Sequence, residues 1–304
     1  MRLKALFDEI VLALRQSGVF FGHGAGCAEE EALWLLAHVC NQAPEALNEQ
    51  SRRHMTPAQT EQARTLLRQR IERRIPMAYV TGQAYFAGLA LLSDERALVP
   101  RSPFAELVRN RFHPWLGRKE PERMLDLCTG GGCIAIAMAT YFPGVHIDAV
   151  DLCRDALSLA AENRRRHNLD EQVRLIHSDL FQHVFESYDV IVSNPPYVGE
   201  SEYRHLPAEY HQEPGMGLVS PGDGLLIPLR IMQQAADYLR PEGLLFLEVG
   251  HSGEMLQEAL PDVPLTWLLF EHGGTGVCVL SRKELLNYRP SVERALKRLD
   301  EDST

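Results

Sequence analysis

The chain has 304 residues, of which 45% are apolar and 24% charged. This composition is that of an ordinary globular protein, and the length predicts one large domain with a smaller one. The formal charge of −10 argues against a protein that coats nucleic acid nonspecifically and would suit a basic protein partner. No apolar run approaches the roughly 18 residues of a membrane span. The first ten residues lack a signal-peptide core, so we expect a cytoplasmic protein with no membrane partner.

The cysteines and histidines do not form a recognisable metal site. Six cysteines are scattered along the chain without a C-x-x-C pair, and the twelve histidines follow no zinc-ligand spacing. We therefore expect reduced cysteines and no bound metal.

The first 75 residues have the periodicity of helices. Apolar residues recur at helical spacing over 3–16, a second apolar stretch covers 30–40, and Thr56-Pro57 is typical of a helix start. The helix that begins there should run to about Arg74. These segments predict a small helical domain over residues 1–75.

A connector and the start of a second domain follow. Residues 76–100 contain Tyr79, Val80, Tyr85 and Phe86 and end in the β-like run Leu98-Val99, which predicts a hairpin. Ser102-Pro103 repeats the cap-plus-proline signal and predicts a helix through about Phe112. We assign residues 101–304 to the second domain.

From Arg123 onward, short apolar strands alternate with helical stretches, the pattern of an α/β protein with a parallel sheet. Only Glu271-His272-Gly273-Gly274-Thr275 separates the last two strands, too short a link for a helical crossover, so these two should be antiparallel. Such a seven-stranded, mostly parallel sheet resembles the class I S-adenosylmethionine-dependent methyltransferase fold. The predicted strands cover 123–127, 145–150, 172–177, 188–193, 243–249, 265–270 and 276–281.

A glycine-rich turn follows the first of these strands. The segment Cys128-Thr129-Gly130-Gly131-Gly132-Cys133 lies between a strand and a helix, where backbone can approach a ligand closely. The second strand ends in Asp151, placed to accept hydrogen bonds from both ribose hydroxyls of an adenosine. A nicotinamide enzyme is an alternative, but the turn lacks the G-x-G-x-x-G spacing. Asp126 also opposes it, because this carboxylate would repel a pyrophosphate, whereas it can bind the methionine ammonium of S-adenosylmethionine.

The next two strands deliver further candidates. Asp179 follows the third strand, where it can accept from an adenine amino group with Leu180 against the ring, or simply cap a helix. The fourth strand ends in Asn194-Pro195-Pro196-Tyr197. An amide oxygen and a donor-free proline backbone at that place can grip a planar NH2, although such a sequence is also ordinary turn punctuation.

Together these segments resemble the Asn-Pro-Pro-Tyr methyltransferases, and within them the HemK-type protein glutamine methyltransferases. The resemblance extends over nearly the whole chain. It implies substrate recognition by residues 1–75 and S-adenosylmethionine as methyl donor. Implied catalytic residues are Asn194, Pro195 and Tyr197, and the implied substrate-binding residues are these three with Pro196. The implied cofactor-binding residues are Asp126, Cys128, Thr129, Gly130, Gly131, Gly132, Asp151, Asp179, Leu180 and Asn194.

Two branches of the family differ in substrate. The release-factor branch usually has Pro-Arg-Pro-(Asp/Glu)-Thr-Glu where this chain has Pro100-Arg101-Ser102-Pro103, which is similar to the branch acting on large-subunit ribosomal protein three. We expect that protein as partner, before or during ribosome assembly, and no direct sequence-specific nucleic-acid binding. Alternatives are a release-factor enzyme, a DNA or RNA adenine methyltransferase, and a non-catalytic assembly factor. Arg101 could pair with a carboxylate near the cofactor or form a connector salt bridge. Glu106 could touch a ligand or merely sit in a first helical turn.

Overall fold

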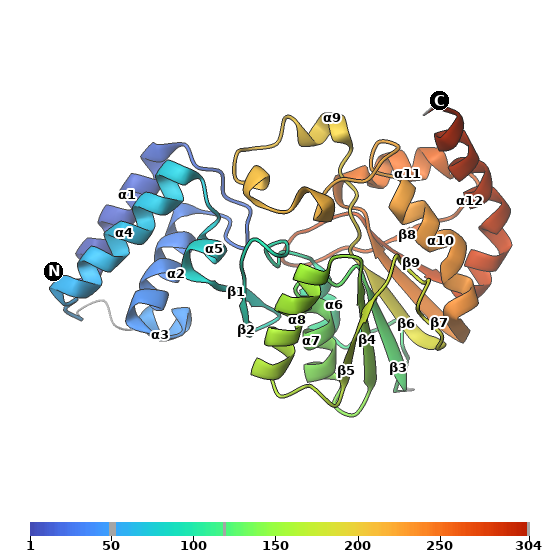
Figure 1. Cartoon of the computed structure of the whole chain (residues 1–304), viewed down its shortest axis with the longest axis horizontal. Coiled ribbons are helices and arrows are strands. Elements are labelled where there is room, and N and C mark those ends of the chain that lie inside the picture. Colours follow the sequence, from blue (N-terminus) through green and yellow to red (C-terminus); the bar gives the residue numbers. More distant parts are fainter. Residues whose placement is uncertain (49–52, 118–119, 303–304) are drawn as a thin grey trace.

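The computed structural model describes residues 1–48, 53–117 and 120–302. A group of helices formed by the first part of the chain lies beside a larger α/β part (Figure 1). No helix in the described ranges is long and apolar enough to cross a membrane.

The helices of the first part pack around an apolar core of their own. They are α1 (Leu3–Ser17), α2 (Ala28–Cys40), α3 (Pro44–Asn48), α4 (Pro57–Arg73) and α5 (Met77–Thr81). The apolar stripe predicted for α1 is buried in this core together with much of α2. Helix α4 begins as predicted, since Thr56 and Gln59 form a capping box with two hydrogen bonds of 3.1 Å.

The connector contains a hairpin, but a shorter one than predicted. Its strands are β1 (Gln83–Phe86) and β2 (Leu89–Leu92). Tyr79 and Val80 lie in α5 instead, because Pro76 precedes the first helical residue and Gly82 ends the helix in the left-handed region. Leu98-Val99 belongs to no strand.

The helix expected after Ser102-Pro103 is α6 (Phe104–Arg109), which ends before the predicted Phe112. Arg111 and Phe112 have φ of 51° and 53°, values that an α-helix cannot accommodate. The chain therefore leaves the helix in a tight turn, and Phe112 turns into the core beneath the sheet.

All seven predicted strands of the large sheet are present. They are β3 (Arg123–Leu127), β4 (His146–Asp151), β5 (Val173–His177), β6 (Tyr188–Ser193), β7 (Leu239–Glu248), β8 (Thr266–Trp267) and β9 (Val277–Ser281). Their order is β5-β4-β3-β6-β7-β9-β8, and β9 runs antiparallel to both of its neighbours. The predicted fold class and the antiparallel pairing of the last two strands are confirmed.

The register aligns the carboxyl ends of the central strands. Leu127 pairs with both Val150 and Ser193, and Ser193 pairs with Leu247. Because these four strands are parallel, the residues that follow the paired positions emerge side by side at one edge of the sheet.

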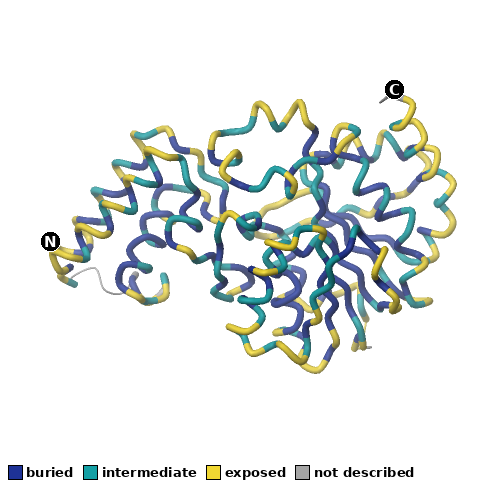
Figure 2. Tube along the Cα trace, in the orientation of Figure 1, coloured by how far each residue is buried: buried dark blue, intermediate teal, exposed yellow. Residues whose placement is uncertain are grey.

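Helices cover both faces of this sheet, so its strands are buried (Figure 2). Helices α6 and α7 (Cys133–Tyr141) pack on one face, and α8 (Arg154–Arg166) lies beside α7. Helices α10 (Leu226–Tyr238), α11 (Gly253–Ala259) and α12 (Arg282–Asp302) form a core with the other face. Between β6 and α10, a long segment with α9 (Glu200–Tyr203) and two 3-10 turns, η1 (Tyr210–Gln212) and η2 (Gly215–Gly217), extends toward the helical part (Figure 1).

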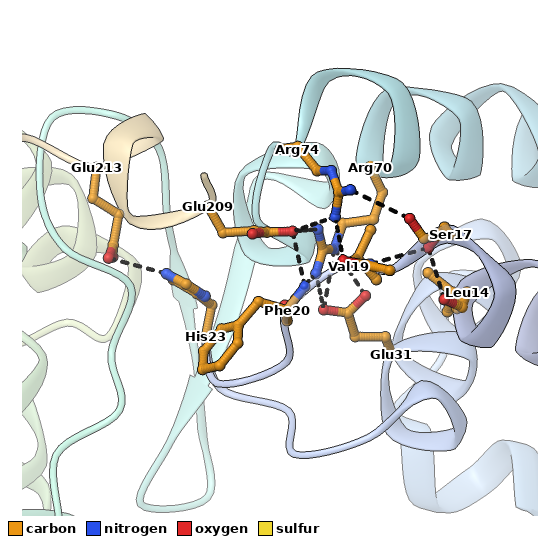
Figure 3. A network of polar contacts seen from close by, with 11 residues as sticks. Leu14, Ser17, Val19, Phe20, His23, Glu31, Arg70, Arg74, Glu209 and Glu213 are labelled. Atoms are coloured by element: carbon orange, nitrogen blue, oxygen red, sulfur yellow. Dashed lines mark hydrogen bonds and ion pairs between the residues drawn. The ribbon is translucent and has the colours of Figure 1, made fainter. Parts of the chain in front are cut away.

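Buried ion pairs join the helical part to this long segment (Figure 3). The Arg70 side chain is 0% exposed and contacts Glu31 at 2.9 Å and Glu209 at 3.0 Å. Burial raises the pKa of Glu209, but hydrogen bonds from Arg70 and from the Phe20 backbone outweigh it and hold that pKa below its usual value. Arg74 adds a second cation at 3.4 Å from Glu209. One arginine of α4 therefore neutralises carboxylates from both parts of the chain.

Replacing Arg70 with Met should leave Glu31 and Glu209 buried without their shared cation. Breaking a buried pair in this way typically costs about 3–5 kcal/mol, so the thermal midpoint of R70M should fall by many degrees. The matched control is Arg68→Met in the same helix, since the Arg68–Glu61 pair is exposed and such pairs contribute about 1 kcal/mol at most. Equal midpoints for the two variants in a thermal unfolding experiment would contradict the importance of the Arg70 cluster.

Candidate active site

A cavity of about 580 Å³ opens at the carboxyl edge of the sheet. This volume lies in the range of small-molecule sites, which are mostly apolar with a few converging polar groups. Its wall comprises the glycine turn, the ends of β4 and β6, the connector, and parts of residues 202–218 and 248–252.

The glycine turn is fixed to the neighbouring strand and helix. The Thr129 backbone N–H donates to the Val150 carbonyl at 2.9 Å. Gly132 has φ of 83°, and a Cβ there would lie 3.1 Å from the Ala160 Cβ. A Cβ at Gly131 would lie 3.2 Å from Leu159, so this side chain of α8 occupies the space beside Gly131. The turn thus brings bare backbone to the cavity wall.

Asp126 lies beneath the turn and does not line the cavity. Its Oδ2 accepts hydrogen bonds from the Thr129 hydroxyl at 2.5 Å and from the Ala135 backbone at 3.0 Å, while its Oδ1 has no partner among the described residues. Burial raises the pKa of this carboxyl to about 7 despite those two bonds. The structure therefore gives Asp126 a role in holding the turn; the expected contact with a methionine ammonium stays a prediction.

Asp151 lies at the cavity wall as expected. Its Oδ2 accepts from the Gly130 backbone and its Oδ1 from the Cys153 backbone, both at 2.8 Å. Burial raises the pKa of Asp151 above its ordinary value, and the backbone donors only partly offset this effect. The two bonds fix the carboxylate and leave further lone pairs to accept bonds from a ligand.

Asp179 and Leu180 also line the cavity, in a turn after β5. Asp179 does not cap a helix, because no helix begins there. Its carboxylate accepts instead from Arg230 at 3.2 Å, and about a third of its side chain is exposed. Leu180 is buried, with φ of 46°. An adenine contact by either residue stays a prediction.

The segment Asn194-Pro195-Pro196-Tyr197 forms another part of the wall, beside the end of β3. Ser193 anchors its start through a 2.7 Å hydrogen bond to the Leu127 carbonyl. Its end is held by the Ser252 hydroxyl, which donates to the Tyr197 carbonyl at 2.8 Å. The segment is thus fastened on both sides, and its prolines lack N–H donors of their own.

Two glycines allow other chain segments to approach Tyr197. A Cβ at Gly224 would lie 2.1 Å from the Tyr197 carbonyl oxygen, and one at Gly250 would lie 2.6 Å from its ring. Both glycines have positive φ. No side chain fits at either place, so the position of Tyr197 depends on these two residues.

The two residues left open by the sequence differ in their surroundings. Arg101 lines the cavity and forms a two-point ion pair with Glu213, at 2.6 and 2.7 Å. The connector salt bridge is therefore the observed arrangement. Glu106 accepts hydrogen bonds from the backbones of Glu271 and His272 and does not line the cavity.

Sequence reasoning missed Ser102 and Glu248, which meet at the wall. Ser102 donates a 2.5 Å hydrogen bond to the Glu248 Oε2, and the Tyr197 hydroxyl lies 3.4 Å from the Oε1. The signal available was position. Glu248 is the last residue but one of the strand predicted over 243–249, at the edge where Asp151 and Asn194 also lie. The long segment contributes Glu202, Leu206, Tyr210, Pro214 and Met216 to the wall, and its sequence carried no such signal.

The chain is similar to curated proteins over most of its length. The chain is 44% identical over 272 residues, 89% of its length and 88% of the relative's, to the ribosomal protein uL3 glutamine methyltransferase of Xanthomonas campestris pv. campestris. It is 40% identical to the protein of that name from Neisseria meningitidis serogroup A, over 91% of both chains. The chain belongs to the ribosomal protein uL3 glutamine methyltransferase family. This membership confirms the HemK-type resemblance and identifies the protein as an enzyme.

Two family models match this member of the uL3 glutamine methyltransferase family, one in each part of the chain. Residues 13–82 match the PrmC N-terminal domain, and residues 112–209 match the methyltransferase small domain. Among solved structures, the hMettl16 catalytic domain in complex with MAT2A 3'UTR hairpin 1 is similar in fold, with a TM-score of 0.51 and 18% identity. That similarity covers 81% of this chain and 90% of the other. The cavity thus lies within a methyltransferase fold.

Proposed function

We propose that the protein methylates the side-chain amide nitrogen of a glutamine in ribosomal protein uL3, with S-adenosylmethionine as the donor. The observation that carries the proposal is the shared edge of the sheet. The glycine turn, Asp151 and Asn194-Pro195-Pro196-Tyr197 line one cavity in a chain at least 40% identical to two uL3 glutamine methyltransferases. A ribosomal substrate accords with a cytoplasmic enzyme.

The donor would occupy the part of the cavity formed by the turn and Asp151. The Asp151 carboxylate would accept from both ribose hydroxyls, and the backbone of residues 128–131 would lie along the methionine moiety. Asp179 and Leu180 would border the adenine. Asp126 would act from below by holding Thr129 and the first turn of α7, unless a water joins its free Oδ1 to the ammonium.

The amide would bind at Asn194 and Pro195. A glutamine nitrogen is a poor nucleophile because its lone pair is delocalised into the carbonyl. If the Asn194 side-chain oxygen and the Pro195 carbonyl accept its two hydrogens, the lone pair turns out of conjugation toward the sulfonium methyl. In-line transfer then depends chiefly on positioning, which the fastened loop supplies. Pro196 keeps the loop rigid, and the Tyr197 ring borders the flat amide.

The helical part of the chain would recognise the substrate protein. Its buried ion pair with Glu209 joins it to the segment whose Tyr210 lines the cavity, which supports this role. The formal charge of −10 favours encounter with a basic partner. We propose that uL3 binds in its free form, before or during assembly of the large subunit, where its target glutamine is accessible.

Incubation with labelled S-adenosylmethionine tests the function directly. Purified uL3 should gain label at one glutamine, whereas release factors, ribosomal RNA and DNA should remain unlabelled. Mature large subunits should be labelled poorly, since the target is then covered. Label in release factors alone would assign the chain to the other branch, and label in nucleic acid would favour the adenine alternative.

Asn194→Ala should abolish this transfer. The variant loses the acceptor that turns the amide, and we expect the single-turnover rate to fall at least roughly 100-fold, as when one preorganised polar group is removed from an active site. Thermal unfolding should change little. Asn287→Ala, on the exposed side of α12, is the control and should retain the wild-type rate. An unchanged rate in N194A would refute the amide grip.

Asp151→Ala should weaken donor binding. Hydrogen bonds to a charged group contribute about 1.5–3 kcal/mol each, so losing the ribose acceptor should raise the Kd of S-adenosylhomocysteine about 10- to 100-fold in calorimetric titration. Asp155→Ala removes an equal charge from the exposed start of α8 and should leave the Kd unchanged. A normal Kd in D151A would exclude Asp151 as the ribose ligand.

A further inference from the structure

The transfer leaves one proton to be removed from the methylated amide nitrogen, and the cavity contains a carboxylate suited to accept it. This inference rests on the proposed function. We propose that Glu248 is the base that receives this proton, and that Ser102 positions its carboxylate.

The strand register places Glu248 next to the amide-binding loop. Ser193 of β6 pairs with Leu247 of β7, so Asn194 and Glu248 follow in adjacent strands at the same edge. Both residues line the cavity. Glu248 is only 5% exposed, and its two oxygens are held separately, Oε2 by the Ser102 hydroxyl at 2.5 Å and Oε1 by the Tyr197 hydroxyl at 3.4 Å. The carboxylate thus faces the loop from a fixed position.

No arginine or lysine forms an ion pair with Glu248 among the described residues, which distinguishes it from the other buried glutamates. Glu213 forms an ion pair with Arg101. Burial raises the pKa of Glu213, but Arg101 and His23 outweigh this effect and lower the pKa to about 2. For Glu248, burial raises the pKa to about 7, and Ser102, Arg101 and Tyr197 offset only part of that effect. A base of this strength is matched to proton transfer near neutral pH.

Three groups near Glu248 do not compete with it as the base. Burial, followed by the charge of Glu248, raises the pKa of the Tyr197 hydroxyl. Burial likewise raises the pKa of the Cys133 thiol, with Asp126 and Glu248 adding to it. Both groups therefore stay protonated near neutral pH. Arg101 is a cation paired with Glu213, so it cannot accept a proton. Asp151, Asp179, Glu202 and His251 also line the cavity, and the exposed imidazole of His251 is the competitor that the variants below test.

The amide nitrogen forms the new N–C bond with its lone pair, and the C–S bond breaks with its electrons staying on sulfur. The nitrogen then carries the methyl group, both hydrogens and a positive charge, and one of the hydrogens leaves its acceptor, Asn194 or Pro195, and passes to the Glu248 carboxylate as a proton. The neutral carboxylic acid releases it to solvent when the products leave.

Because only the ionised carboxylate accepts a proton, kcat at saturating donor and uL3 should fall as pH decreases through about 7. This fall in kcat is the acid limb of the pH–rate profile. Glu248→Gln should lower kcat at pH 7.5 at least tenfold and remove the acid limb. Affinity for S-adenosylhomocysteine and the thermal midpoint should stay close to wild type. His251→Gln is the matched control and should keep the limb.

Ser102→Ala gives an independent test. Losing a hydrogen bond to the carboxylate raises its pKa, so the limb should move upward by roughly one pH unit. Ser102→Thr, which keeps the hydroxyl, should restore the wild-type position of the limb. A purely structural Ser102 would change the thermal midpoint and leave the limb in place.

The outcomes separate the two proposals. A wild-type enzyme that never labels uL3 would refute the proposed function itself. If wild type is active but E248Q keeps both its rate and its acid limb, Glu248 is not the base. Loss of the limb in H251Q instead would assign the proton to His251 and overturn the inference.

Discussion

The site depends first on the register of four parallel strands. Leu127 pairs with Val150 and Ser193, and Ser193 pairs with Leu247. Side chains of a strand alternate between its faces, so a slip of one residue would turn each strand-end side chain to the opposite face. The glycine turn, Asp151, Asn194 and Glu248 come from distant parts of the sequence. Only this pairing brings them to one edge.

The second constraint is the burial of charge where the two parts of the chain meet. Arg70 neutralises Glu209, and Arg101 neutralises Glu213, so two arginines from outside the long segment hold it at the cavity. Such pairs contribute less to stability than their geometry suggests, because each charge loses its hydration. Their value here is positional, since an unpaired carboxylate in either place would be costly. The helical part and the cavity wall are therefore fixed to each other through the same few residues.

Much of the sheet and of the site edge could be predicted from the sequence, because the patterns that indicate them lie within short segments. Strand alternation and the short 271–275 link indicated the sheet, and the residues after each strand indicated the site edge. Tyr79 and Val80 were misassigned because Pro76 and Gly82 bound a single helical turn that β-propensity obscures. Asp126 precedes the glycine turn, as in the family pattern. Its side chain nevertheless accepts a hydrogen bond from the first turn of α7 and does not line the cavity. This orientation depends on how the strand and α7 pack, which the sequence pattern does not give. The Arg101–Glu213 pair spans 112 residues, a separation over which no pattern in one sequence carries information.

Ser102 is notable both in the sequence comparison of the two branches and in the structure of the site. In the sequence it is the residue that sets Arg101-Ser102-Pro103 apart from the Arg-Pro pattern of the release-factor branch. In the structure it donates the 2.5 Å hydrogen bond to Glu248 at the cavity wall. A proline at this position has neither a hydroxyl nor an N–H and could not make that bond. The residue that differs between the branches therefore hydrogen-bonds, in this chain, to a carboxylate that Tyr197 also contacts. A chain with proline there would have to hold the same carboxylate by other means, or do without it.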